Sequence, residues 1–164
     1  MRKNNFKTML NLSELCDFLV KAKQGTYASG EESIKTKEAD GSTTLIFEDG
    51  EWRYHDNYFG GEPYGGREVV FWQGQPVYLM IYYGQVSPEI TDCSEIYRVL
   101  QQALTLIPKD RPYRGPAEYK TGDYQYLNTF QGEVDSFSGE EVIKHQGREI
   151  YRAKYCGGLV DQRK

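Results

Sequence analysis

The sequence is poor in the residues that build metal and redox sites. It has three cysteines (Cys16, Cys93, Cys156) and two histidines (His55, His145) in 164 residues, with no Cys-x-x-Cys pair. Because zinc ligands normally come in closely spaced pairs, we expect no metal site and no cofactor. Widely spaced single thiols are typical of reduced cysteines in a cytoplasmic protein.

Long apolar runs and clustered positive charge are also missing. No stretch approaches the roughly 20 apolar residues of a membrane helix, and residues 1–6 contain no apolar signal-peptide core. Lysine and arginine total 20 against 24 acidic residues, a net charge of −4. Affinity for a phosphate backbone depends on clustered cations. We therefore expect a cytoplasmic protein that binds neither membranes nor nucleic acid directly, with Lys35, Lys37, Arg111 and Arg114 as solvated surface residues.

Glycine and aromatic residues, by contrast, are abundant, with 17 Gly, 14 Tyr, 7 Phe and 2 Trp. Aromatic residues favour strands and glycine favours tight turns. The clearest hairpin joins 67–72 to 75–83 through Gln73-Gly74. Further strands are predicted over 43–48, 51–59 and most of 119–156.

Two segments have the apolar spacing of amphipathic helices. The first covers 12–22 and begins with a capping box formed by Asn11 and Glu14. The second covers 93–107, with Asp92 as the predicted N-cap. Between these segments and their strands, 23–42 is predicted to be a mobile loop and 108–118 a connector.

The helices and strands form an internal repeat. Residues 66–84 and 139–157 are identical at eight of 19 positions without a gap, where chance gives about one or two. Similar turns in two unrelated hairpins are the alternative explanation. We predict a single α+β domain over 1–164, mainly curved antiparallel sheet with two helices, built from pseudo-repeated halves at 11–84 and 92–158.

The strand that carries Val77, Leu79 and Ile81 is apolar on both faces, whereas its counterpart has Arg152 and Lys154. Such a strand lies in the centre of a sheet under a helix, or at a subunit interface. A homodimer through this face is therefore one prediction.

Differences between the halves indicate where function lies. Arg53, His55 and Asp56 have no counterparts in the second half, but His55 and Asp56 are adjacent and point to opposite faces of a strand. No catalytic residue is assigned. Glu68 and Glu141 occupy equivalent positions, where they either form an acid–base pair or each bind groups in their own half.

We predict that a small molecule or a protein partner binds in an aromatic cleft of the first half. The candidate binding residues are Arg53, Tyr54, His55, Asp56, Tyr58, Glu68, Tyr82 and Tyr83. The alternatives are a hydrolase-like enzyme that uses Asp56 and Glu68, and a dimeric structural or partner-binding protein.

Several short motifs resemble a bacterial family of uncharacterised domains. They are Thr26-Tyr27-Ala28-Ser29-Gly30, Tyr54-x-Asp56-x-Tyr58-Phe59-Gly60-Gly61, Gly66-x-Glu68-Val69-Val70, Tyr82-Tyr83-Gly84, Phe137-x-Gly139-x-Glu141 and Tyr155-x-Gly157-Gly158. The resemblance begins near residue 12. Family members occur alone or behind an Xre-like helix-turn-helix domain and are then labelled transcriptional regulators, but the stretch before residue 12 is too short for that domain. The resemblance implies no known activity and no catalytic residues.

Overall fold

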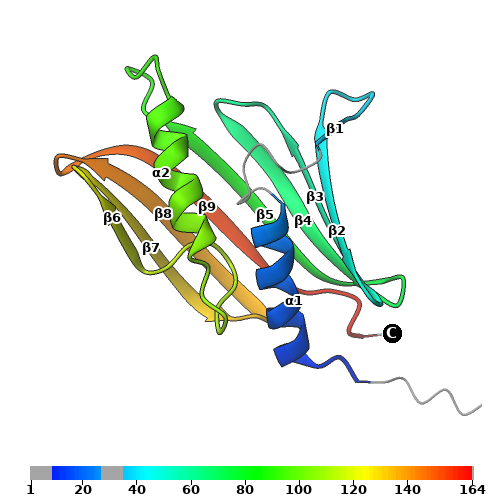
Figure 1. Cartoon of the computed structure of the whole chain (residues 1–164). Helices are drawn as coiled ribbons and strands as arrows, with labels where there is room; N and C mark the ends of the chain where they lie inside the picture. The colour runs from blue at the N-terminus through cyan, green and yellow to red at the C-terminus, as the bar shows by residue number, and fades with distance from the viewer. Residues whose placement is uncertain (1–8, 27–34, 164) are drawn as a thin grey trace, which may run out of the picture.

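The computed structural model describes residues 9–26 and 35–163. Within these residues, two helices lie on one face of a curved antiparallel sheet (Figure 1). The α+β class predicted from the sequence is confirmed. The expectations for residues 1–6 and for the 27–30 part of the first motif lie outside the described residues.

The described part of the sheet has nine strands in the order β1-β2-β3-β4-β5-β9-β8-β7-β6. The first half consists of β1 (Thr36–Lys37), β2 (Thr43–Asp49), β3 (Trp52–Phe59), β4 (Tyr64–Trp72) and β5 (Gln75–Val86). The second half consists of β6 (Glu118–Thr121), β7 (Tyr124–Glu133), β8 (Ser136–His145) and β9 (Arg148–Leu159). The halves join at the centre of the sheet, where β5 pairs with β9. The internal duplication stays a prediction.

The predicted hairpin between β4 and β5 is confirmed. Gln73 and Gly74 have φ angles of 50° and 75°. Positive φ at both central residues is the geometry of a type I′ turn, whose twist matches that of the flanking strands. Gln146 and Gly147 have φ angles of 50° and 81° and turn β8 into β9 in the same way.

The first helix, α1 (Leu12–Gly25), begins at the predicted cap. Asn11 Oδ1 accepts hydrogen bonds from the backbone N–H groups of Ser13 and Glu14 at 3.0 and 3.3 Å. Glu14 in turn accepts from Asn11 Nδ2 at 3.0 Å. These bonds satisfy donors that a helix leaves unpaired at its first turn.

The second helix, α2 (Ser94–Thr105), starts one residue later than predicted. Its N-cap is Cys93, so the expected N-cap at Asp92 is wrong. The Asp92 carboxylate nevertheless accepts from the Ser94 N–H at 3.0 Å. An Asp can hold the chain two residues ahead of it in a turn without being the cap itself.

The loop predicted over 23–42 is shorter than expected. Helix α1 continues to Gly25, and Thr36–Lys37 forms the edge strand β1 on Thr43 and Thr44. Residues 27–34 of that loop lie outside the described residues. Lys23 also belongs to the helix, and this position matters for the site described below.

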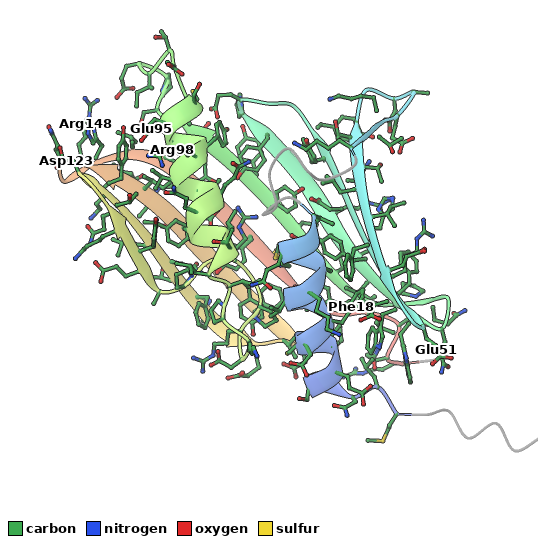
Figure 2. The ribbon with its side chains drawn as sticks, viewed as in Figure 1. Phe18, Glu51, Glu95, Arg98, Asp123 and Arg148 are labelled. Atoms are coloured by element: carbon green, nitrogen blue, oxygen red, sulfur yellow. The ribbon has the colours of Figure 1, made fainter. Side chains whose placement is uncertain are left out.

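The core lies between the two helices and the sheet. Helix α1 buries Leu15, Phe18, Leu19 and Ala22, chiefly against the first half. Phe18, which Figure 2 labels on this helix, stacks on Trp52 with ring centroids 5.4 Å apart. Helix α2 buries Ile96, Val99, Leu100, Ala103 and Leu104, chiefly against the second half. Burial of each Leu, Ile, Val or Phe side chain among these contributes about 1.5–3 kcal/mol. Neither helix of the described chain is long and apolar enough to span a membrane.

The face of β5 that points away from the helices is exposed to solvent only in part. Val77 is buried, whereas Ile81 and Tyr83 are exposed. The central position of β5 agrees with its apolar sequence. A homodimer through this face stays a prediction.

Candidate functional site

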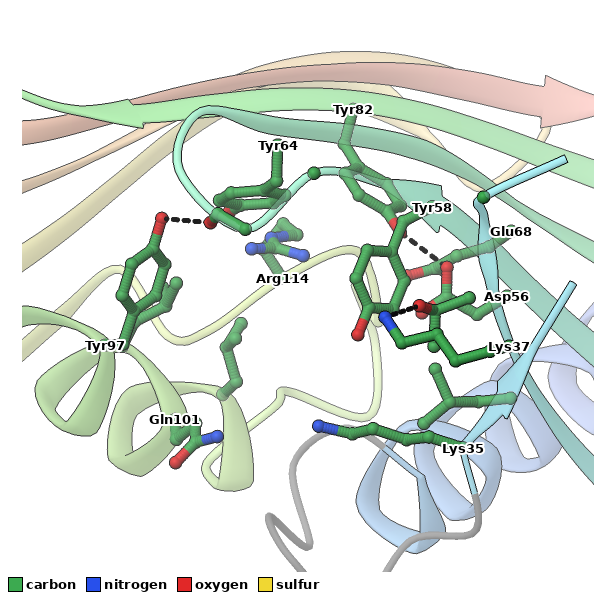
Figure 3. A pocket seen from close by; sticks show the side chains of 17 residues that line it. Lys35, Lys37, Asp56, Tyr58, Tyr64, Glu68, Tyr82, Tyr97, Gln101 and Arg114 are labelled. Carbon is green, nitrogen blue, oxygen red and sulfur yellow. Dashed lines mark hydrogen bonds between the residues drawn. The ribbon is translucent and has the colours of Figure 1, made fainter. Parts of the chain in front are cut away.

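A cavity of about 510 Å³ lies between the inner face of the first half and helix α2 (Figure 3). Its floor comes from strands β2 to β5, one side wall from α2, and another wall from Arg114 in the connector. The lining side chains that carry polar groups are Lys35, Lys37, Thr43, Asp56, Tyr58, Tyr64, Glu68, Tyr82, Tyr97, Gln101 and Arg114.

Strand register brings the two carboxyl groups together. Asp56 on β3 lies directly opposite Glu68 on β4. Directly opposite residues have Cβ atoms about 4.5–5.5 Å apart and point to the same face. Both line the cavity, and their exposed fractions are 3% and 0%.

A glycine next to this pair makes room for Tyr82. Tyr82 on β5 is paired with Gly66 on β4, which has no side chain to fill the inner face. The Tyr82 hydroxyl reaches β3 and donates to Asp56 Oδ1 at 2.5 Å. Asp56, Glu68 and Tyr82 thus form one polar cluster on three adjacent strands.

Lys23 provides the positive charge beneath Glu68. Its ammonium lies 2.8 Å from Glu68 Oε2, and both side chains are 1% exposed. It also donates to the Tyr113 carbonyl oxygen at 2.6 Å. Burial lowers the pKa of Lys23, while the charge of Glu68 opposes this shift. One of the two floor carboxylates is therefore already neutralised by helix α1.

Asp56 titrates near neutral pH. Burial, together with the negative charge of Glu68, raises its pKa to about 7, although the Tyr82 hydrogen bond acts in the opposite direction. Burial and the nearby charge of Asp56 also raise the pKa of Tyr82. A carboxyl group that gains and loses its proton near pH 7 is a frequent feature of functional sites.

Arg114 is buried, which corrects its expected position on the solvated surface. It is 4% exposed, and its Nε and Nη2 atoms donate to Glu141 Oε1 at 3.1 and 2.5 Å. Glu141 also accepts from Tyr126 at 2.6 Å. The guanidinium lies 5.8 Å from the centre of the Tyr82 ring. Glu141 therefore matches the charge of Arg114 within the second half. This is the arrangement in which each carboxylate binds groups in its own half, rather than the acid–base pair of Glu68 and Glu141.

The rim and the α2 wall carry further polar groups. Lys37 Nζ donates to Thr43 Oγ1 at 2.7 Å, and the Tyr97 hydroxyl donates to the Gly61 carbonyl oxygen at 3.1 Å. Lys35 points across the cavity toward Gln101 (Figure 3). Lys35 and Lys37 are exposed, as expected from the sequence.

The cavity contains half of the residues predicted from the sequence. Asp56, Tyr58, Glu68 and Tyr82 line it, and Tyr54 is fully buried in the α1 core beside them. The other predicted residues do not line it, since strand neighbours alternate between faces. Arg53, His55 and Tyr83 lie on the outer face of the sheet, where Arg53 approaches Glu48 at 3.4 Å and Tyr83 is 56% exposed.

Sequence reasoning missed Lys23 and Arg114. Lys23 had a readable signal, because it follows Leu15 and Leu19 at helical spacing and so lies on the apolar face of α1. A lysine at such a position requires a buried anion. Arg114 lies in an aperiodic connector, and no pattern predicts which way its side chain points.

The described residues contain no group of three or more His, Cys, Asp or Glu side chains placed to hold a metal ion. The floor of the cavity offers two carboxyl groups, of which one is paired with lysine. These groups can form hydrogen bonds and ion pairs and can exchange a proton.

The second half has a related cluster that is filled by the protein itself. Asn128 lies opposite Glu141, and Tyr155 donates to Asn128 Oδ1 at 2.7 Å. Asn128 Nδ2 donates to the Gly115 carbonyl oxygen at 2.9 Å, and the Gly115 N–H donates to the Tyr126 hydroxyl at 3.0 Å. A backbone segment thus occupies the space in front of this cluster.

Comparison with known proteins identifies a family. Residues 56–160, which include most of the cavity floor and Arg114, match the family model described as Domain of unknown function (DUF5680). Among curated proteins and solved structures, nothing matches the chain. The family match covers more than half of the sequence, and the chain belongs to the DUF5680 family.

Proposed function

We propose that this domain binds a small polar molecule in the cavity between the first half of the sheet and helix α2. The observation that carries the proposal is Asp56, a carboxyl group that is 3% exposed and lines the cavity. Among the described residues, Tyr82 donates a hydrogen bond to it, and no cation forms an ion pair with it. A ligand would supply the missing partners.

The cost of burying Asp56 supports a binding role. A buried carboxylate without a cation is strongly disfavoured unless hydrogen bonds compensate for the lost water. Stability alone is better served by an amide at this position, as Asn128 illustrates in the second half. The volume of about 510 Å³ lies within the roughly 300–1,000 Å³ that is typical of small-molecule sites.

A thermal-shift screen of the full chain against a metabolite library tests this proposal. We expect at least one compound to raise the melting temperature in a concentration-dependent way, because a ligand that binds only the folded state stabilises it. Gln101→Trp places a large ring on the cavity wall and should abolish the shift. Gln101→Ala keeps the cavity open and should preserve it.

Two results would overturn the proposal. The first is a library that covers the main classes of metabolites and yields no stabilising compound. The second is a compound whose stabilising effect is equal in Gln101→Trp and Gln101→Ala, since it would bind elsewhere on the protein.

A second candidate is an enzyme that uses Asp56 and Glu68 for acid–base chemistry. The direct pairing of the two carboxyl groups in one cavity favours it, together with the pKa of about 7 at Asp56. A general acid or base works best when its pKa is close to the working pH. Incubating each stabilising compound with the protein, followed by mass spectrometry, separates the candidates. Turnover that is lost in Asp56→Asn while binding remains would favour the enzyme.

A further inference from the structure

The charges beneath the cavity do not balance. Asp56 and Glu68 lie on its floor with Lys23 paired to Glu68, and Arg114 is paired to Glu141. All five side chains are almost completely buried. When every group is ionised, three carboxylates face two cations among these described residues, and the unmatched negative charge belongs to Asp56.

The rim lysines do not correct this imbalance. Lys35 and Lys37 are exposed, and Lys37 Nζ binds Thr43 Oγ1. Exposed charges interact weakly with a buried group because water and salt screen them. A cation that enters the cavity would be the direct partner of Asp56.

The second half indicates whether the partner of Asp56 must be a hydrogen-bond donor or an acceptor. There, Asn128 occupies the corresponding strand position and donates to a carbonyl oxygen, at Gly115. An ionised carboxylate such as Asp56 can only accept hydrogen bonds. The group that faces the ionised form of Asp56 must therefore be a donor.

Glu68 provides a second acceptor at the same place. Its Oε1 atom is buried and receives no hydrogen bond from the described residues, while Lys23 lies at Oε2. A buried acceptor without a partner costs about 1–3 kcal/mol. The buried Glu68 carboxylate lies next to Asp56 and adds negative charge at this place, whereas Asp56 offers the acceptor that a ligand can reach.

Tyrosine rings line the cavity from these carboxyl groups to helix α2. The Tyr64 ring lies 6.0 Å from the rings of both Tyr82 and Tyr97, so that three rings run from the floor to helix α2. Tyr58 lies beside Asp56 on the same face of β3 (Figure 3). The faces of aromatic rings attract cations.

We propose that the ligand carries a protonated amine, which binds at Asp56, next to the buried Glu68, in this tyrosine-lined cavity. This assignment rests on the proposed binding function and specifies its ligand class. The ammonium donates hydrogen bonds to Asp56 and neutralises the charge that the described residues leave unmatched.

Proton exchange follows from this arrangement. The charged groups around Asp56 are Glu68 on β4, Lys23 on α1 and Arg114 in the connector. The rim lysines Lys35 and Lys37 and the hydroxyl groups of Tyr82 and Tyr58 line the same cavity. An ammonium ligand favours the ionised form of Asp56, so binding below neutral pH releases a proton. Affinity for an amine should fall as the pH decreases from 8 to 5.5.

Matched compounds test the ligand class. Each set contains an amine, an alcohol and a carboxylate on one carbon skeleton, for example 2-phenylethylamine, 2-phenylethanol and phenylacetate. We expect the amines to bind at least about tenfold more tightly than the alcohols, as a charge-assisted hydrogen bond implies. Calorimetry in two buffers of different ionisation enthalpy should detect proton release near pH 6.

Two variants complete the test. Asp56→Asn should remove the preference for amines and the proton release, and the folded state of this variant is checked by its circular dichroism and melting temperature. Glu48→Gln makes the same chemical change on the exposed outer face and should retain both properties.

The outcomes separate this inference from the proposed function. Stabilisation by alcohols, carboxylates or other compounds, without any by amines, overturns the amine class and leaves small-molecule binding intact. Amine binding that is unchanged in Asp56→Asn also overturns it. The absence of any stabilising compound, in the matched sets and in the wider library alike, overturns both.

Discussion

Tyr82 and Tyr155 lie directly opposite each other where β5 pairs with β9 at the centre of the sheet. The Tyr82 hydroxyl donates to Asp56 at 2.5 Å and the Tyr155 hydroxyl donates to Asn128 at 2.7 Å. Two closely related frameworks thus hold an acid in one half and an amide in the other. The amide is satisfied by the backbone of Gly115, whereas the acid borders a cavity.

Replacing Tyr82 by Phe should raise the pKa of Asp56 above about 7. The Tyr82 hydroxyl donates to the carboxylate and so favours its ionised form. The titration of the Asp56 carboxyl carbon, followed by NMR, measures the change. Tyr83→Phe removes a hydroxyl from the next residue, on the exposed outer face, and should leave the midpoint unchanged. An unchanged or lower midpoint in Tyr82→Phe would contradict the hydrogen bond.

Asp56→Asn should change how stability depends on pH. In the wild type, the folded state keeps the Asp56 proton up to about pH 7, whereas an unfolded Asp releases it near 3.9. The free energy of unfolding therefore loses a contribution as the pH rises from about 4 to about 7, and stays level above that. The Asn variant lacks this loss, so it should gain about 3 kcal/mol relative to the wild type between pH 4.5 and 8.

Urea denaturation across this pH range measures the difference between the two proteins. Titrating groups distant from Asp56 are shared and cancel in the subtraction. Glu48→Gln, on the exposed outer face, serves as the control and should differ from the wild type by a nearly constant amount. An Asp56→Asn difference that is equally flat would show that Asp56 titrates as it does in the unfolded chain.

Lys23→Met should strongly destabilise the fold. It leaves Glu68, which is completely buried, without its cation, and breaking a buried ion pair costs about 3–5 kcal/mol. Lys21→Met, two residues earlier on α1, removes an exposed pair with Asp49 and should cost less than about 1 kcal/mol. Urea denaturation at pH 7 distinguishes these values.

A double variant shows whether the charge or the side-chain volume of Lys23 matters. Lys23→Met combined with Glu68→Gln removes both charges and should regain a large part of the lost stability. If the double variant is no more stable than Lys23→Met alone, the packing of the lysine stem, rather than the ion pair, accounts for the effect.

The secondary structure could be predicted from the sequence because each element has a characteristic local pattern of residues. Apolar spacing indicates α1 and α2, and Gln73-Gly74 and Gln146-Gly147 supply the positive φ angles of two turns. The start of α2 was displaced by one residue because the Asp92 side chain binds the same Ser94 N–H that a cap would bind. Local patterns locate elements better than they locate their ends.

The site was only partly predictable, for reasons of geometry. Alternation along β3 correctly separates Asp56 and Tyr58 from Arg53 and His55, but the sequence does not state which face the helices cover. The pairing of Asp56 with Glu68 depends on the register of the β3–β4 hairpin. Arg114 reaches the site through a connector, and such long-range placement leaves no periodic trace in the sequence.

Gly66→Ala should disturb the floor of the cavity. A Cβ atom at this position would lie 2.4 Å from the Asn57 carbonyl oxygen and 2.7 Å from Tyr58 Cα. Strands β3 and β4 must therefore separate beside Asp56, and we expect a loss of about 1–3 kcal/mol, typical of overpacking. The variant should also weaken any ligand-induced thermal shift.

Gly61→Ala is the matched control for Gly66→Ala. Gly61 also lines the cavity, but a Cβ atom there has no neighbour within 4 Å among the described residues. Its effect on the free energy of unfolding should stay within about 0.5 kcal/mol. Equal effects of the two substitutions in urea denaturation would contradict the close approach of β3 to Gly66. They would also contradict the role of Gly66 in leaving room for Tyr82 to reach Asp56.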